Sequence, residues 1–131
     1  MNVLCPICAI DSTSHSFYLL YQDDGKHVFY SCPSQASKYN DMDGILSHFK
    51  NVLDHYNCAE ILWSWIFDFN GFELKHMFEI QIAIGLANII NNYSKYLTEI
   101  RIINTNFYTH SMLRIVRPFL NNHIQNIIKL N

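Results

Sequence analysis

The chain has 131 residues, of which 50% are hydrophobic, and its formal net charge at pH 7 is -2 with neutral histidines. This length and composition predict a single folded domain spanning residues 1–131 with one core, and they exclude a disordered chain. Because the charges form no long block of one sign, the sequence also lacks the broad basic face that would bind the phosphates of a nucleic acid.

The apolar segments are short. Glu60–Phe69 and Ile80–Ile90 are both interrupted by polar residues before reaching about 20 positions, the length that crosses a bilayer. Residues 1–15 contain no basic stretch followed by a long apolar one, so no secretory signal is visible. We therefore expect an intracellular, cytoplasmic protein without structural disulfides.

The first third of the chain predicts a hairpin followed by a helix. Ser16–Gln22 and His27–Cys32 are rich in aromatic and aliphatic residues and flank the turn sequence Asp-Asp-Gly-Lys, as in an antiparallel hairpin. After a polar connection, Asp41 or Asp43 can cap a helix. The apolar positions of that helix recur at helical spacing and comprise Ile45, Leu46, Phe49, Val52, Leu53 and Tyr56.

The middle of the chain predicts two strands joined by a helix. Ile61–Phe69 has large side chains at odd and even positions, as expected for a central strand covered on both faces. Leu74–Tyr93 has apolar residues three and four apart and predicts a long helix. Glu99–Asn104 is short and β-branched, so the three segments together predict a right-handed crossover between parallel strands.

The last part of the chain predicts one more helix and strand. Thr109 is a plausible N-cap for an amphipathic helix that is interrupted at Pro118, and Asn126–Leu130 has the composition of a strand. Hairpin, helix, strand, helix, strand, helix and strand in this order predict an α/β fold. Its sheet is mixed and largely parallel, with helices packed on it as a sandwich.

Four short motifs follow one another along the second half of the chain. They are Asp68 with Gly71 after an apolar strand, Ile102–Asn104 at the end of the next strand, Pro118–Leu120 in the last helix, and the closing apolar run Ile127–Leu130. In this order and spacing they resemble the CRAL-TRIO lipid-binding domain, the family of the yeast phosphatidylinositol transfer protein.

The resemblance implies binding of a hydrophobic small molecule or lipid by a carrier or sensor that contacts membranes peripherally, with no enzymatic activity and no required cofactor. In the family the sheet is the floor of a lipid pocket and the Pro-Phe-Leu helix is its gate. Arg114 and Arg117 then lie outside the gate, as a solvated face or a contact for acidic lipids. The expected lining or gate residues, which equally fit a solid core, are Trp63, Trp65, Phe67, Phe78, Ile82, Phe107, Met112, Ile115, Val116 and Phe119.

The same resemblance implies a structural motif made of Asp68, Gly71, Asn104 and Pro118. Asp68 is expected to accept hydrogen bonds from backbone amides of the following turn, where Gly71 permits a positive φ. The pattern places no nucleophile and no second carboxylate beside Asp68, which favours an architectural role over acid catalysis.

Several departures from the family pattern leave a second interpretation open. Trp63 and Trp65 stand where phospholipid carriers have small hydroxyl residues, which predicts a small or closed pocket. Ser94–Tyr96 replaces a Pro-Glu-Arg segment, so phosphoinositide specificity is not expected. The chain resembles a minimal domain whose uncovered edge is closed by dimerisation. The alternative function is that of the related BCH domains, which serve as scaffolds for protein interaction and self-association without lipid.

The N-terminal extension, residues 1–15, contains a separate motif. Cys5 and Cys8 form a C-x-x-C pair, and His15 and Cys32 complete a tetrahedral zinc site if the hairpin brings them together. Ordinary free thiols are the alternative.

Overall fold

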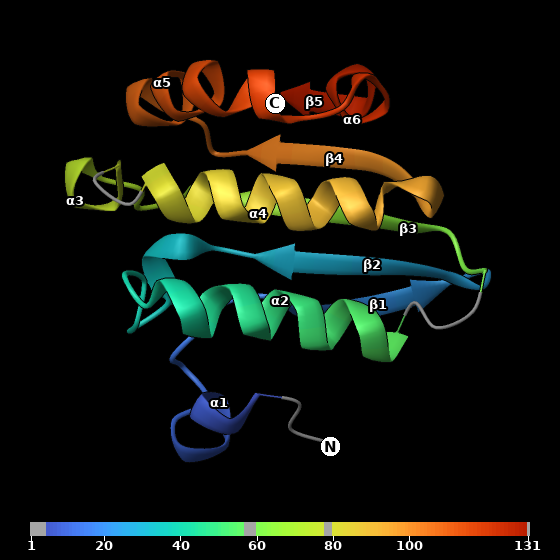
Figure 1. Ribbon diagram of the computed structural model, residues 1–131, viewed down its shortest axis with the longest axis horizontal. Coiled ribbons are helices and arrows are strands. Elements are labelled where there is room, and N and C mark those ends of the chain that lie inside the picture. The colour runs from blue at the N-terminus through green and yellow to red at the C-terminus, as the bar shows by residue number, and fades with distance from the viewer. Residues whose placement is uncertain (1–4, 57–59, 78–79, 131) are drawn as a thin grey trace.

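The computed structural model describes residues 5–56, 60–77 and 80–130 and contains one five-stranded mixed sheet (Figure 1). The strand order is β1-β2-β3-β4-β5, in which β1 and β2 are antiparallel and all other neighbours are parallel. This confirms the predicted fold class. The strands are β1 (Tyr18–Asp23), β2 (Lys26–Ser31), β3 (Trp63–Asp68), β4 (Leu97–Ile103) and β5 (Ile128–Leu130).

Helices α2 and α4 lie side by side across one face of the sheet (Figure 1). Within the described residues, no helix is long and apolar enough to cross a membrane. The helices are α1 (Pro6–Ile10), α2 (Met42–Tyr56), α3 (Leu74–Met77), α4 (Ile80–Asn92), α5 (Phe107–Val116) and α6 (Asn122–Ile127), with 3-10 turns η1 (Pro33–Gln35), η2 (Ser94–Tyr96) and η3 (Arg117–Phe119).

The predicted hairpin is the pair β1 and β2. Its two turn residues, Asp24 and Gly25, have φ angles of 50° and 75°, so the turn matches the right-handed twist of the strands that it joins. A register shift between Leu19 and Tyr21 adds one residue to β1 near its start. Because of this bulge, the side chains of β1 do not alternate strictly between the two faces of the sheet, so the period-two rule fails for this strand.

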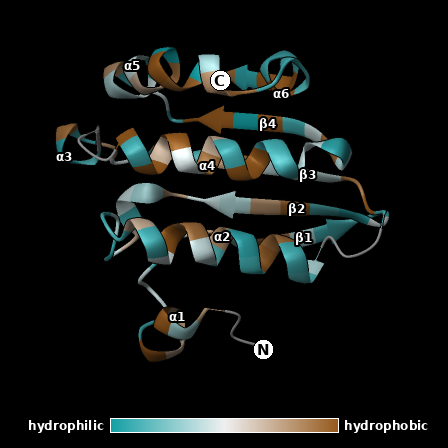
Figure 2. Cartoon of the chain, viewed as in Figure 1, coloured by the Kyte–Doolittle hydropathy of each residue, from teal (hydrophilic) through white to brown (hydrophobic). Residues whose placement is uncertain are grey.

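The central strand is less covered than expected. Trp63 and Trp65 are buried on the face that packs on α2 and α4, whereas Ser64 and Ile66 on the other face stay half-buried. Leu62, just before the strand, is 50% exposed. The apolar residues of α2 and α4 (Figure 2) pack on the face that carries the tryptophans. The expectation that both faces of this strand are fully covered is therefore wrong.

The helix predicted over Leu74–Tyr93 is divided into α3 and α4, and residues 78–79 between them lie outside the described part of the chain. Toward the C-terminus the sequence missed α6, whose N-cap Asn121 accepts a hydrogen bond from the Ile124 amide at 2.9 Å. The last strand consequently begins at Ile128 instead of Asn126. A helix of six residues is too short to show an apolar periodicity in the sequence.

Helix α5 begins at a capping box. The Asn106 side chain accepts a hydrogen bond from the Thr109 amide at 3.1 Å, and the Thr109 hydroxyl accepts one from the Asn106 amide at 3.2 Å. Thr109 is therefore at the third helical position, and the prediction that it is the N-cap was wrong. Asn106 also donates from its side-chain amide to the Phe72 carbonyl at 3.0 Å, which joins the start of α5 to the segment after β3.

Replacing Asn106 with Ala removes both the cap and the bond to Phe72. We expect the free energy of unfolding, measured by urea denaturation, to fall by about 1–2 kcal/mol, the usual effect of losing a helix cap. Asn88→Ala on the exposed side of α4 is the matched control and should change it by less than about 0.5 kcal/mol. If both variants have the same free energy of unfolding, the Asn106 cap does not stabilise α5.

Candidate functional site

Aromatic side chains form one wall of the interior. Trp65, Phe67 and Phe69 occupy alternate positions on and just after β3, so all three point to the same face of the sheet. Their rings stack in succession with centroids 4.5 Å apart, and Phe72 continues the row edge-on at 4.8 Å. At the other end Phe49 of α2 meets Trp65 at 5.8 Å. Rigid rings in contact make a continuous apolar surface.

A partly open cavity of about 150 Å³ lies between this aromatic wall and helices α2, α4 and α5. The side of the cavity formed by α4 carries small residues, Ala83 and Ala87, together with the aliphatic Leu86 and Ile90. Large flat rings on one side and alanines on the other leave volume that side chains do not fill. The cavity is therefore apolar and sits where a ligand would contact the sheet and three helices at once.

Half of the residues expected to line a ligand pocket do so. Trp65, Phe67, Ile82, Met112 and Val116 all line the cavity. Trp63 is 1% exposed but lies outside it, with its indole N–H donating to the Tyr93 carbonyl at 3.0 Å. Phe78 lies outside the described residues.

The remaining three expected residues, Phe107, Ile115 and Phe119, are on the outer surface of α5 and η3 with 76%, 38% and 46% of their surface exposed. The inward face of α5 is formed by Thr109, Met112 and Val116, which are three and four positions apart. On that spacing Phe107 and Ile115 point away from the cavity, so the sequence did contain the information needed to separate the two groups. It also contained signals for residues that were missed, because Phe69 continues the alternation of β3 and Ala83, Leu86, Ala87 and Ile90 share one face of α4.

The Asp68 carboxylate collects three hydrogen bonds at the carboxyl end of the sheet. One oxygen accepts from the Asn70 amide and the Asn104 side chain, both at 2.9 Å, and the other accepts from the Tyr30 hydroxyl at 2.6 Å. These partners come from the ends of β2 and β4 and from the turn after β3. Gly71 in that turn has φ 77°, and an added Cβ would come within 2.9 Å of the Ser34 hydroxyl. Asn104 has φ 55°, a left-handed conformation that asparagine tolerates.

The electrostatics of this network support an architectural role. Burial acts to raise the pKa of Asp68, but the hydrogen bonds from Tyr30, Asn104 and the Asn70 amide outweigh it, so the pKa lies below its usual value. Burial, followed by the bond to Asp68, raises the pKa of Tyr30. The carboxylate therefore stays ionised, as an acceptor that joins three strands, and Pro118 lies apart from it in η3.

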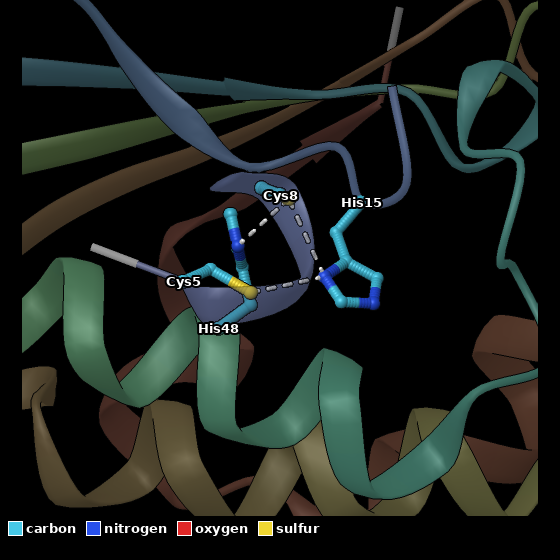
Figure 3. A group of neighbouring side chains, drawn as sticks. All are labelled: Cys5, Cys8, His15 and His48. Carbon is cyan, nitrogen blue, oxygen red and sulfur yellow. Dashed lines mark hydrogen bonds between the residues drawn. The ribbon is translucent and has the colours of Figure 1, made fainter. Parts of the chain in front are cut away.

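The expected metal ligands are only partly brought together. Cys5, Cys8 and His15 meet, but the fourth neighbour is His48 of α2, with the four donor atoms all within 4.8 Å of one another (Figure 3). Cys32 lies elsewhere, with its sulfur 3.5 Å from both the Ser34 hydroxyl and the Asn70 carbonyl. The set containing Cys32 is corrected accordingly. The missed signal was a histidine at position 48 on the apolar face of a predicted helix.

Comparison with known proteins agrees with this fold. A family model described as the CRAL/TRIO domain matches residues 14–131. The chain belongs to the CRAL-TRIO family. The crystal structure of Sfh5 superimposes with a TM-score of 0.71 at 11% sequence identity, over 93% of this chain and 50% of that one. The chain thus spans half the length of Sfh5, and at this identity the likeness shows the fold alone. No curated protein matches the sequence.

Membership places the chain among lipid-binding and lipid-transfer domains. The matched region contains the whole aromatic wall, the Asp68 network and helix α5, whereas Cys5 and Cys8 precede it. In this CRAL-TRIO domain the N-terminal cluster adjoins the cavity, because His15 belongs to the cluster and also lines the cavity.

Replacing Asp68 with Asn keeps the side chain's shape but removes its charge. We expect the free energy of unfolding at pH 7 to fall by about 1–3 kcal/mol, since charged acceptors make the stronger hydrogen bonds. Because the folded pKa is lowered, the carboxylate stabilises the fold above its unfolded pKa of about 3.9 and loses this effect as the pH falls through the folded value. The gap between wild type and variant should therefore narrow below about pH 4.

Urea denaturation across that pH range measures the gap. Asp23→Asn, at the exposed end of β1, is the control and should stay close to wild type throughout. A difference between wild type and Asp68→Asn that persists unchanged into acid would contradict the assigned network.

Proposed function

We propose that this CRAL-TRIO domain binds a hydrophobic small molecule, or the apolar tail of a lipid, in the cavity between the sheet and helices α4 and α5. The observation that carries the proposal is the apolar cavity itself, walled by Trp65, Phe67 and Phe69. Each methylene moved from water into such a site contributes about 0.8 kcal/mol, so a ligand can be held without any reactive group.

Unfilled apolar volume lowers the stability of a folded protein, which supports the proposal that a ligand occupies the cavity. Apolar volume that side chains do not fill lowers stability in enclosed cores by about 24 cal/mol per Å³. Native interiors contain few voids larger than a water molecule. A ligand that fills this volume would recover much of that stability on binding.

The volume sets the size of the guest. An apolar cavity of about 150 Å³ holds a molecule such as benzene, whereas pockets for larger ligands measure about 300–1,000 Å³. The cavity therefore suits a compact apolar molecule or a short length of acyl chain. A longer tail needs more room, which α5 would provide by moving outward as a gate, since it covers the cavity with Met112 and Val116.

The domain has no catalytic role in this proposal, since Ser31 and His76 on the cavity wall are already engaged in hydrogen bonds. The Ser31 hydroxyl accepts from the Trp65 indole N–H at 2.8 Å, and His76 accepts from the Glu73 amide through Nδ1 at 2.8 Å. Burial, followed by the charge of Lys75, lowers the pKa of His76 and keeps its ring neutral. Hydrogen bonds of this kind orient the wall and leave no activated nucleophile among these groups.

The outer surface of the gate suits a membrane. Phe107 and Phe119 are exposed there, and Arg114 and Arg117 line a surface groove beside Pro118. Apolar side chains that enter the boundary between headgroups and acyl chains, with arginines at the level of acidic headgroups, give reversible peripheral binding. The same helix would then contact the bilayer and open the cavity toward it.

The proposed function fits a location inside the cell. Among the described residues Cys5, Cys8 and Cys32 form no disulfide, as is usual in a reducing compartment. We therefore place the domain in the cytoplasm, with peripheral contact to membranes.

Protein interaction is the second candidate function, favoured by the edge strand. Tyr18, Leu20 and Tyr21 are exposed large hydrophobic residues of β1, which is the edge strand next to β2 in the described sheet. Exposed edges of this kind associate with other chains unless they are covered. A BCH-like scaffold that self-associates through β1, without bound lipid, would use this surface. Native mass spectrometry separates the two, because it reports bound lipid and dimer mass in one spectrum.

Filling the cavity should weaken ligand binding. We expect Ala83→Phe to weaken binding of a dansyl-labelled fatty acid by about tenfold or more, because losing contact with about two methylenes already changes the affinity that much. Asn88→Phe places the same ring on the exposed side of α4 and is the matched control. Fluorescence titration measures both, and equal affinities for the two variants would place the ligand outside the cavity.

Placing a charge on the gate should weaken membrane contact. Phe119→Asp is expected to lower association with phosphatidylserine vesicles several-fold in a sedimentation assay, because a carboxylate neither enters the interface nor tolerates acidic lipids. Leu62→Asp, exposed before β3, is the control for an added charge. If both variants bind vesicles equally well, the surface of α5 and η3 is not the contact.

A further inference from the structure

We infer that Cys5, Cys8, His15 and His48 bind a structural zinc ion that fastens the N-terminal segment to helix α2. The four side chains come from three places along the chain: α1 and the residue before it, the loop leading to β1, and the middle of α2. Figure 3 shows the two sulfurs and the two imidazole rings turned toward one another. Two thiolates and two imidazoles are a common ligand set for structural zinc.

The distances fit a tetrahedral site. The His15 Nδ1 atom lies 3.5 Å from the Cys5 sulfur and 3.6 Å from the Cys8 sulfur, and His48 Nδ1 lies 3.7 Å from the Cys8 sulfur. With Zn–S of about 2.3 Å and Zn–N of about 2.0–2.1 Å, tetrahedral angles place sulfur and nitrogen ligands about 3.5 Å apart. These three sulfur–nitrogen separations match those of ligands around one small ion, and all four donor atoms lie within 4.8 Å of one another.

Both imidazoles are held in the tautomer that a metal requires. His48 donates from Nε2 to the Phe17 carbonyl at 2.7 Å, and His15 faces the Asp41 carboxylate with Nε2 at 3.3 Å. A carbonyl and a carboxylate only accept hydrogen bonds, so the proton of each neutral ring is on Nε2. The lone pair of each Nδ1 then points into the cluster. Such outer partners are the usual second-shell support of zinc-bound histidines.

Local structure arranges the cysteine pair. Cys5 is the N-cap of α1, Pro6 opens the helix, and Cys8 follows within its first turn, which brings both sulfurs to one side. Cys5, His15 and His48 are buried and Cys8 is half-buried. Four protein ligands shielded from solvent leave no open position for a substrate, so the site is structural rather than catalytic.

The N-terminal segment needs such an attachment. Helix α1 has five residues and buries none of them, and Ile10 at its end is almost fully exposed. Figure 1 shows α1 outside the layer formed by α2 and α4. Apolar packing therefore holds this segment weakly, while a zinc ion shared with His48 would connect it to the core. This inference does not depend on the proposed ligand, because the cysteine pair lies outside the matched family region.

The test uses the whole chain, expressed without a metal-binding tag and dialysed against zinc. Elemental analysis should find one zinc per chain in the wild type. Cys8→Ser and His48→Ala should each bind zinc at least about 100-fold more weakly, since losing a ligand removes several kcal/mol of coordination energy. Cys32→Ser is the matched control and should bind like wild type, because Cys32 lies outside the cluster.

Cobalt substitution keeps the proposal testable if a variant fails to fold. Wild type loaded with Co²⁺ should show the intense visible bands of a tetrahedral site and the charge-transfer bands of two thiolates. The proposal is overturned if folded wild type takes up no zinc, if Cys32→Ser loses the metal while His48→Ala keeps it, or if cobalt gives the pale spectrum of an octahedral site.

Discussion

The alternation of aromatic residues along β3 is the constraint on which the rest of the structure depends. A strand sends successive side chains to opposite faces, so Trp65 and Phe67 must share one face of the sheet, and Phe69 continues the row beyond the strand. Burying those rings needs helices on that side, and α2 and α4 lie there. Rings are rigid, and α4 presents Ala83 and Ala87 to the same interior. The cavity follows from this combination of large flat residues and small ones.

Asp68 connects this interior to helix α5, the gate in the proposed function. The carboxylate ties the ends of β2 and β4 to the turn after β3, and the next residues of that turn lead to the Phe72 carbonyl that Asn106 holds. Asn106 in turn caps α5, the helix that covers the cavity. The Asp68 charge at the end of an apolar strand thereby helps to fix the position at which α5 begins. Binding and architecture are linked through backbone and amide hydrogen bonds rather than through a reactive group.

Sequence patterns predicted most of this fold and a part of its site. Period-two and period-3.6 spacings identified the strands and long helices, and the ordered motifs around Asp68, Asn104 and Pro118 identified the family. The patterns could not reveal which of two capping residues begins α5, because Asn106 and Thr109 both have suitable side chains. They also paired Cys5 and Cys8 with Cys32, since nearness in sequence cannot show that His48, some 30 residues beyond His15, lies across from them. Phe107 and Phe119 were predicted as lining or gate residues, and both are exposed on α5 and η3 instead of lining the cavity.

Photocrosslinking with a fatty acid that carries a diazirine in its chain tests the central claim most directly, because it reports which residues surround the guest. After irradiation of the wild-type protein and peptide mapping by mass spectrometry, the account predicts labels on the segments of β3, α4 and α5 that wall the cavity, such as those holding Phe67, Ala83 and Met112. Labels confined to the outer face, on Tyr18 and Tyr21 of β1 or on Phe107, would contradict it.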